Sequence, residues 1–305
     1  MNSSVSADKA LDSHQMPSTE KKVMAPSRGI SWTPTLFIVG AHIGALFGFF
    51  TFSWHALALC LVLHWITGGL GITLTYHRLL THRSFEVPKP VEYFLAILAS
   101  LACQGGPVSW VSAHRLHHSK SDDEGDPHSP LQGFFWAHMG WCMSNIASIH
   151  RYEDYAKFAP DLAKDPGHVL LDKIHIVWTL LLAAGLYAWG GWSFVVWGIF
   201  VRLVLVYHCT WLVNSAAHVW GYQTYDSKDQ SRNLWWVALL SYGEGWHNNH
   251  HAFQHSARHG LKWWEFDSTY LMIQVMKFFR LARDIKLPTS DVLERRLLRP
   301  VPVPV

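Results

Sequence analysis

The sequence predicts an all-α integral membrane protein, with four transmembrane helices in two hairpins and a helical cap on the cytoplasmic side. Two long runs are free of Asp, Glu, Lys and Arg, one from Gly29 to His77 and one from Ile174 to Val201. Only 15% of the 305 residues are charged, against about 25% in ordinary soluble domains. The 17 Trp suit a membrane interface, whereas the 21 His need a separate explanation.

Tails are expected at both ends of a single membrane domain that spans 31–290. Residues 1–30 are polar and rich in Ser, Lys and Pro, and no apolar run follows a basic start as it would in a signal peptide. They are therefore predicted to form a flexible N-terminal tail. Residues 291–305, which end in a proline-rich stretch, are predicted to form a C-terminal tail.

The first uncharged run is too long for one membrane crossing of about 20 residues and fits two. A turn at Ser53–His55 would separate them. In the second block, Gly190 and Gly191 suit a turn, and the flanking Trp189 and Trp192 suit an interfacial belt. The length of the uncharged runs disfavours the alternative of buried hairpins in a soluble core. We therefore expect spans at about 34–53, 56–75, 174–190 and 192–213.

Two hairpins place the N-terminus, residues 78–173 and residues 214–305 on the same side of the membrane. Nearly all Lys and Arg fall on that side, which the positive-inside rule makes cytoplasmic. Arg202 lies within the fourth span and is expected to extend toward that face. The short apolar segments 91–103 and 233–242 are predicted to be buried or interfacial helices.

Two histidine motifs share one spacing. HRLHH at 114–118 and HNNHH at 247–251 both place imidazoles at positions i, i+3 and i+4, which lie on one face of a helix. Neutral imidazole is a good ligand for divalent iron, copper and zinc. A single motif of this kind also fits a solvated polar patch, but two motifs brought to one membrane face favour a metal site.

Further histidines extend the pattern. His77 and His82 are five residues apart, about 140° around an ideal helix, so they either bind different metals or one of them follows a helix end. Asn214 and His218 form an i, i+4 pair at the end of the fourth span. With His218 there are nine candidate ligands, which indicates two metals with four or five ligands each.

The type of metal follows from the donors. The four Cys form no CxxC pair, and neither an HExxH motif nor the Glu-x-x-His motif of soluble di-iron bundles occurs. An all-histidine dinuclear site at a membrane face favours iron with oxygen chemistry.

The net charge of the chain is only +3, so the sequence does not predict a basic surface that binds nucleic acid.

From about residue 33 to residue 288 the chain resembles the membrane fatty-acyl desaturase family, and within it the Δ9 desaturases. The resemblance rests on HRLLTH (77–82), HRLHH and HNNHH in that order, with WLVNSAAH at 211–218 and GEGWHNNHH at 243–251. DPHSP (126–130) and QGGPVSW (104–110) are similar to the acyl-lipid branch of cyanobacteria and plants.

The resemblance implies a set of site residues, with no catalytic group beyond the metal ligands. Asn214 would approach one iron through water. The bend in the bound acyl chain would be lined by Gln104, Trp110, Thr210 and Trp211. Two Fe²⁺ ions would be bound by His77, His82, His114, His117, His118, His218, His247, His250 and His251. Carboxylates near the motifs are candidate acceptors for imidazole N–H groups: Asp122, Asp123, Asp126, Glu244 and Asp267.

The resemblance also implies the reaction, an O2-dependent dehydrogenation that makes a cis double bond between C9 and C10 of a stearoyl or palmitoyl chain. Acyl-CoA desaturases carry an Arg-Asp and an Arg-Lys pair for CoA where this chain has Ser112-Ala113 and Ser144-Asn145. CoA is highly anionic and needs such cations, so a membrane glycerolipid is the expected carrier. The implied location is a cyanobacterial-type plasma or thylakoid membrane.

Electrons would come from a separate donor, and the acyl-lipid branch implies ferredoxin, an acidic protein. Its expected dock is a group of basic residues on the cytoplasmic side: Arg258, Lys262, Arg280 and Arg283. Ordinary positive-inside charge explains these residues equally well.

Several alternatives stay open at this point. An acyl-CoA Δ9 desaturase and a membrane di-iron hydroxylase or ketolase are the nearest. A histidine-rich metal transporter would need polar residues along its spans, and a haem-binding electron carrier would need paired histidines such as His42, His64, His175 and His208. Chain length, glycerol position and oligomeric state are left undetermined.

Overall fold

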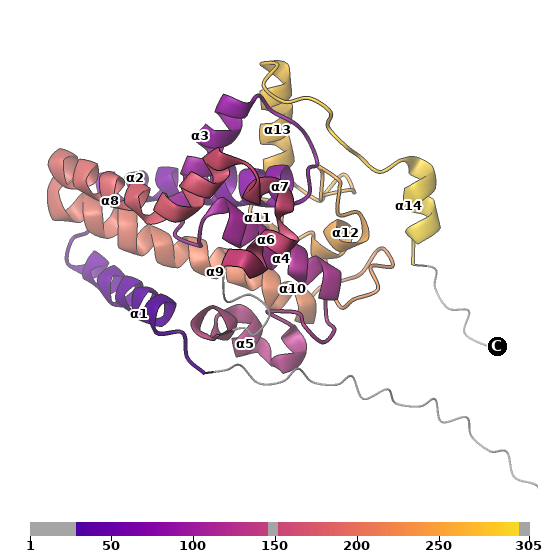
Figure 1. The fold of residues 1–305 in the computed structure, drawn as a ribbon, viewed down its shortest axis with the longest axis horizontal. Helices are drawn as coiled ribbons and strands as arrows, with labels where there is room; N and C mark the ends of the chain where they lie inside the picture. Colours follow the sequence, from indigo (N-terminus) through magenta and orange to yellow (C-terminus); the bar gives the residue numbers. More distant parts are fainter. Residues whose placement is uncertain (1–28, 146–151, 299–305) are drawn as a thin grey trace, which may run out of the picture.

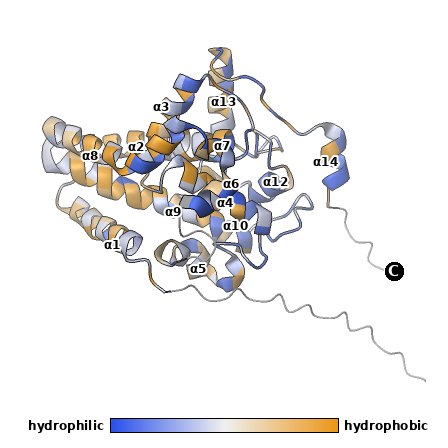
Figure 2. Cartoon of the chain, in the orientation of Figure 1, coloured by the Kyte–Doolittle hydropathy of each residue, from blue (hydrophilic) through white to orange (hydrophobic). Residues whose placement is uncertain are grey.

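The computed structural model describes residues 29–145 and 152–298, and every regular element in these two stretches is helical, with isolated β-bridges between some loops. The expected tail at 1–30 lies almost entirely outside the described residues. Figure 1 shows long helices at one end of the molecule and short helices with loops at the other. In Figure 2 the hydrophobic residues gather on the long helices α2, α8 and α9, whereas α12, α14 and their loops are hydrophilic.

The first two long elements form a hairpin. Helix α1 (Trp32–Leu46) continues into a short 3-10 helix, η1 (Phe47–Phe49). After a turn the chain enters α2 (Trp54–His64), where the Ser53 hydroxyl accepts a hydrogen bond from Ala56 N and so satisfies a free N–H of the first turn. The turn therefore falls at the position expected from the sequence.

Helix α2 runs directly into a π-helix, η2 (Trp65–Thr81). Its wider turn is visible in bonds between residues five apart: the Thr75 hydroxyl donates to Leu70 O, and His82 N donates to His77 O. Gly71 lies against the next helix so closely that a Cβ there would be 2.7 Å from Ala99 Cα. η2 thus packs backbone to backbone, and π-helical segments of this kind occur mostly at functional sites.

Helix α3 (Lys89–Ser100) occupies the apolar segment predicted at 91–103 and buries Leu95, Ala96 and Ala99. Helix α4 (Pro107–Lys120) starts with proline at its first position, as helices often do. The following segment is made of short helices: η3 (Pro130–Gln132), α5 (Phe134–His138), η4 (Gly140–Met143), α6 (Tyr152–Phe158) and α7 (Pro160–Ala163).

A second long stretch comprises α8 (Pro166–Val195), the π-helix η5 (Val196–Val201) and α9 (Arg202–Asn214). The helix breaks inside α8, where Gly191 has φ +65°, a conformation that suits glycine. After the break the chain packs back on itself, because a Cβ on Gly198 would lie 2.6 Å from Leu186 Cδ1. The break is at the glycine pair where the sequence predicts a turn.

Three helical segments are long and apolar enough to cross a membrane: Trp32–Phe49, Trp54–Thr81 and Pro166–Val219. The third contains the break at Gly190–Gly191. Many large apolar side chains on these segments are exposed, including Phe49, Phe50 and Trp189. Such a surface is unfavourable in water and suits lipid.

Arg202 does not extend toward the cytoplasmic face, contrary to the expectation. Its side chain is fully buried, Nε donates to Gly198 O at 2.6 Å, and Nη1 donates to Leu101 O at 2.9 Å and to Thr67 Oγ1 at 3.0 Å. Two carbonyls and a hydroxyl satisfy the guanidinium inside the protein, so it ties α9 to η2 and to the end of α3.

The C-terminal region contains α10 (Ala216–Val219), α11 (Trp235–Leu240), α12 (His247–Ala252), α13 (Ser268–Phe278) and α14 (Ser290–Arg296). Helix α11 matches the apolar segment expected at 233–242 and exposes Trp235 and Leu239. Helix α14 falls where a tail was expected. Arg296 Nη1 donates to Ala252 O at 2.6 Å, so this helix is attached to the end of α12.

Candidate metal centre and acyl cavity

The two HxxHH motifs each lie on one helix, α4 and α12, but each motif divides between two clusters. On α4, His114 and His118 join one cluster and His117 joins the other. On α12 the division is reversed: His250 joins the first cluster, and His247 and His251 join the second. In each motif the first and last histidines, which are four residues apart, therefore belong to the same cluster. The middle histidine, three residues after the first, belongs to the other cluster.

The first cluster has five histidines from η2, α4 and α12. The Nε2 atoms of neighbouring members approach closely: His77 to His250 at 3.1 Å, and His118 to His250 at 3.0 Å. His118 Nε2 also lies 3.0 Å from His114 Nε2. Its members are His77, His82, His114, His118 and His250, and their ligand atoms all lie within 4.8 Å of one another.

The second cluster has four buried histidines. His247 Nε2 lies 3.0 Å from His218 Nε2, and the other two members are His117 and His251. His117 is fully buried, and its Nε2 has no hydrogen-bond partner; His251 Nε2 has none either. Buried polar atoms without a partner are unfavourable unless something else binds them.

These clusters fit metal ions. Two nitrogens held at about 2.1 Å from one metal, with a right angle between them, are roughly 3.0 Å apart, which is the spacing seen in both clusters. Burial lowers the pKa of His114, His118, His247 and His250 well below the usual range of histidine. These imidazoles are therefore neutral near pH 7 and have a lone pair free for a metal.

His77 and His82 lie in the same cluster, their ring centres 4.7 Å apart. On a regular α-helix the two residues would lie about 140° apart, but this segment is a π-helix. In η2 the bond from His82 N to His77 O spans five residues, so one wide turn brings the two side chains together. His82 also caps the end of η2, which was the second possibility considered.

Carboxylates bind the far nitrogen of several cluster histidines. His77 Nδ1 lies 2.7 Å from Glu244 Oε2, and His117 Nδ1 donates to Asp126 Oδ1 at 2.9 Å. Although burial opposes ionisation, the pKa of Asp126 is held well below its usual range by His117 beside it. An ionised acceptor keeps the proton on Nδ1 and points Nε2 at the cluster, an arrangement common around metal-binding histidines.

The other expected carboxylates differ in position. Asp122 Oδ2 lies 3.6 Å from His218 Nδ1 and accepts from Gln230 N. Asp123 is exposed, and among the described residues no hydrogen bond joins it to a cluster histidine. Asp267 accepts from Arg78 and caps α13 through Tyr270 N. Asp126 and Glu244 therefore contact cluster histidines directly, whereas Asp267 acts one residue further away.

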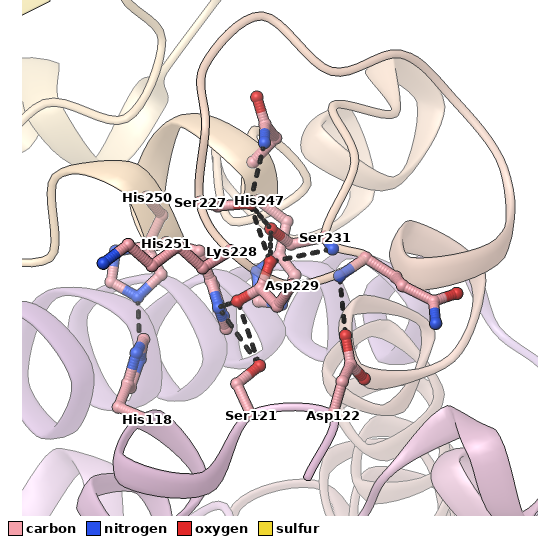
Figure 3. Close-up of polar contacts among 12 residues, drawn as sticks. His118, Ser121, Asp122, Ser227, Lys228, Asp229, Ser231, His247, His250 and His251 are labelled. Atoms are coloured by element: carbon pink, nitrogen blue, oxygen red, sulfur yellow. Dashed lines mark hydrogen bonds and ion pairs between the residues drawn. The ribbon is translucent and has the colours of Figure 1, made fainter. Parts of the chain in front are cut away.

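Asp229 was not predicted, because it lies outside every histidine motif. Its Oδ2 accepts from His251 Nδ1 at 2.5 Å and from Ser121 Oγ at 3.0 Å. Its Oδ1 accepts from Ser227 Oγ at 2.8 Å and from Ser231 N at 3.0 Å. Figure 3 shows this carboxylate at the centre of a loop that closes over α12.

We expect Asp229→Asn to weaken metal binding by about 10- to 100-fold, the usual effect of losing an outer partner of a metal-bound histidine. The amide keeps the size of the side chain but no longer accepts from His251 with a full charge. Iron content after titration with a chelator measures the effect. Asp226→Asn is the matched control, because Asp226 is exposed and its carboxylate accepts from Lys228 N. Equal iron affinity in both variants would contradict the prediction.

Three further residues contact the site although none of them was predicted to do so. Arg78 is fully buried and binds Glu244 Oε1 and Asp267 Oδ2. His259 Nδ1 lies 3.0 Å from Glu244 Oε2, and burial lowers the pKa of His259 to about 4. His128 stands against His117 with ring centres 4.1 Å apart, and burial lowers its pKa to about 3.

A cavity of about 750 Å³ runs past the clusters and is lined by His77, His114 and His247. Ser31, Ser144 and Asn145 contribute to its lining, as do Gly68, Ile72 and Tyr242. Among the described residues that line it, Glu244 is the single charged side chain, and no Lys or Arg contributes. The cavity thus suits a long apolar chain held beside the metal centre.

The four residues expected at a bend in the substrate all line this cavity, together with Asn214. Trp110 Nε1 donates to Gln104 Oε1 at 3.1 Å, and Gln104 Nε2 donates to Thr210 Oγ1 at 3.0 Å. Trp110 also stacks on His114, with ring centres 5.0 Å apart. A fixed polar strap therefore crosses the cavity wall next to the first cluster, and Trp211 is buried beside it.

The histidines considered for haem are engaged elsewhere. His42 Nε2 and His208 Nε2 are 3.2 Å apart and bind each other, whereas two axial ligands of one haem iron would be about 4 Å apart with a ring between them. His64 Nδ1 binds the Tyr242 hydroxyl, and His175 Nδ1 donates to Asp172 O. The geometry disfavours a haem carrier.

Comparison with known proteins is consistent with these features. A family model described as fatty acid desaturase matches residues 30–282. An sn-1 stearoyl-lipid 9-desaturase of Anabaena variabilis is 55% identical over 260 residues, which cover 85% of this chain and 94% of the relative. An sn-1 stearoyl-lipid 9-desaturase of Synechocystis sp. is 47% identical, with 92% and 87% covered. An sn-2 palmitoyl-lipid 9-desaturase of Nostoc sp. is 47% identical, with 86% and 94% covered.

Proposed function

This chain belongs to the fatty acid desaturase family, and from that membership we propose that it is a Δ9 acyl-lipid desaturase. It is an oxidoreductase that converts the C9–C10 single bond of a stearoyl or palmitoyl chain, esterified to a membrane glycerolipid, into a cis double bond. The observation that carries the proposal is a cavity with no Lys or Arg among its described lining residues, which passes directly beside two histidine clusters. O2 is the oxidant.

The two clusters are proposed to hold two iron ions. The five-histidine cluster would hold one and the four-histidine cluster the other, with Asn214 reaching the second through water from the cavity wall. Bound iron with O2 supplies the oxidising power that an unactivated methylene requires, since its C–H has no acidity for a base to use. No side-chain acid or base in the cavity is assigned a role in C–H cleavage.

The protein's own residues position the chain and exclude water. The strap formed by Trp110, Gln104 and Thr210 is rigid, because each polar atom in it has a partner. A saturated chain that follows this wall is bent where it passes the first cluster, and a bent conformer leads to the cis product. Asp126, Asp229 and Glu244 hold protons on Nδ1 of their histidines and so fix ring orientation.

The lining of the cavity supports a lipid-bound rather than a CoA-bound chain. Ala113, Ser144 and Asn145 line it at positions where acyl-CoA enzymes are expected to carry charged groups. Among the described residues here, nothing cationic is available for the phosphates of CoA. A neutral or weakly charged glycerolipid does not require cationic side chains for its head group.

The membrane arrangement is proposed to comprise four spans, with the site on the cytoplasmic side. The break at Gly190–Gly191 and the packing of Gly198 on Leu186 support two crossings within Pro166–Val219. The relatives from cyanobacteria support a plasma or thylakoid membrane of that type. The domain then extends from about residue 31 through α14.

Expression in a host without a Δ9 desaturase tests the function. The expected result is a new cis Δ9 double bond in glycerolipid acyl chains, with double-bond position determined by mass spectrometry and glycerol position by lipase digestion. An alcohol or ketone product would identify a hydroxylase or ketolase instead. A double bond at C5 or C7, or product confined to acyl-CoA, would overturn the regiochemistry or the carrier.

Chain length is expected to depend on Tyr242, which lines the acyl cavity. Its ring lies over Gly68, where a Cβ would be 3.1 Å from Tyr242 Cε2, and its hydroxyl binds His64. Tyr242→Gly removes the ring and tolerates the backbone φ of +60°. We expect the ratio of 18- and 20-carbon to 16-carbon products to rise by roughly tenfold, since one methylene in a pocket is worth that much. Tyr242→Phe keeps the ring, and an altered ratio in this control would contradict the prediction.

A further inference from the structure

A second cavity, of about 420 Å³, reaches the metal centre from the surface. It is lined by the segment His251–Ser256, by Lys286–Pro288 and by Val292 and Arg296 of α14. No residue lines both this cavity and the acyl cavity. The acyl cavity meets His77, His114 and His247, whereas the second cavity meets His251, so the metal centre is approached through two separate openings.

His255 connects the second cavity to the first histidine cluster. Its side chain is exposed in the cavity, and its Nδ1 donates to the backbone carbonyl of His82 at 3.0 Å. His82 belongs to the first cluster, and His251, four residues before His255, belongs to the second. The exposed His255 imidazole is thus joined to the first cluster by its hydrogen bond to His82. It is joined to the second cluster by the four-residue stretch of backbone that leads back to His251.

The charged residues that line this cavity are both cations. Lys286 Nζ donates to Arg83 O at 2.7 Å, and Arg296 Nη1 donates to Ala252 O at 2.6 Å, so each binds a carbonyl rather than a carboxylate. Both side chains are exposed. Asp291 and Glu294 also lie on α14 but do not line the cavity. The exposed Leu287 lies between these cations and provides an apolar contact.

The basic residues expected to form a dock are less suited. Lys262 is held over the rings of Tyr222 and Trp264, and Arg283 Nε faces Glu86 Oε2 at 3.3 Å. Arg258 Nε donates to Gly260 O, and none of these residues lines either cavity. Their positive charges already interact with aromatic rings, a carboxylate or a carbonyl of the protein. None of these residues is connected to a cluster histidine in the way that His255 is.

The reaction needs electrons from outside. Reducing O2 to two waters takes four electrons and four protons, and removing two hydrogens from the acyl chain supplies two of each. The balance is –CH2–CH2– + O2 + 2 e⁻ + 2 H⁺ → –CH=CH– + 2 H2O. Two reduced one-electron carriers must therefore be oxidised in each turnover, and the protons come from water.

We infer that the second cavity is the docking surface of an acidic one-electron carrier protein, with His255 as the point of electron entry. This inference rests on the proposed function, because it presumes that O2 is reduced at the centre. The two cations match an acidic partner and steer its approach. Weak redox encounters bury less surface than stable complexes, so a small docking surface suits such a partner.

Binding of a [2Fe–2S] ferredoxin to the full-length protein in detergent tests the inference. We expect Lys286→Glu to weaken the affinity by about tenfold at low ionic strength, and Lys286→Gln to weaken it less, because one reverses and the other removes a steering charge. Both differences should shrink as salt is raised. At saturating ferredoxin, His255→Leu should slow oxidation of the reduced ferredoxin by the protein in stopped flow, because the point of electron entry is lost.

Lys277→Glu is the matched control, an exposed Lys on α13 that does not line the cavity. Its affinity should equal that of the unmodified protein. No binding by the unmodified protein, equal affinity after Lys286→Glu, or an equal loss from Lys277→Glu would each overturn the inference. Ferredoxin binding is measured without acyl substrate. A failed Δ9 assay with intact, Lys286-dependent binding would therefore reject the proposed function alone.

Discussion

His117→Ala is expected to lower desaturation by more than about a hundredfold, because even outer partners of metal-bound histidines are worth about 10- to 100-fold. His117 is fully buried, its Nε2 faces the second cluster without a partner, and its Nδ1 binds Asp126. Alanine removes a proposed ligand, and Asp126 keeps only its hydrogen bonds from Asp122 N and His128 N. Iron bound per chain should fall from about two to about one, measured on purified protein together with product formation in cells.

His55→Ala is the control for this experiment. His55 is exposed at the start of α2, near the turn that joins the first two long helices. We expect both the iron content and the activity of this variant to match the unmodified protein. Full activity in His117→Ala would remove the assignment of His117 as a ligand.

The second large effect is expected for stability. Arg78→Met should lower the free energy of unfolding by about 3–5 kcal/mol, the usual cost of removing one partner of a buried ion pair. Arg78 Nη2 lies 3.0 Å from Glu244 Oε1, and Nη1 lies 2.9 Å from Asp267 Oδ2. Both carboxylates are buried, and they would be left without a counter-charge. Thermal unfolding in detergent measures the change.

Arg283→Met provides the comparison. The Arg283 side chain is 74% exposed, and its partner Glu86 is 58% exposed. Exposed pairs of this kind contribute about 0–1 kcal/mol. An equally small shift in unfolding temperature for Arg78→Met would contradict the prediction. It would mean that water or other groups stabilise the charges of Glu244 and Asp267 when the arginine is absent.

Much of the fold could be predicted because the relevant signals are local. Long uncharged runs, Ser53 before α2 and the pair Gly190–Gly191 located the long helices and both turns. The prediction failed where tertiary packing overrides local pattern. Arg202 is enclosed by Leu101 O and Thr67 from other elements, and α14 forms where Arg296 finds Ala252 O.

The same division applies to the site. Six of the nine histidines could be recognised because HxxHH on a helix is a local pattern. Asp229 was missed because it comes near His251 through a loop that folds over α12, which no spacing in the sequence reveals. Only the structure shows that His77 and His82 share a cluster, because the wide turn of η2 brings the two side chains together.

By itself the sequence predicted the membrane class, histidine as the type of metal donor and the nine candidate ligands, because composition and helical spacing are properties of neighbouring residues. Only the tertiary structure decided that the histidines divide into five and four, and that Asp126, Glu244 and Asp229 orient them. It also decided that two cavities approach the centre separately. The physical reason is that a ligand set is defined by ångström distances between side chains far apart in the chain, and packing alone sets those distances.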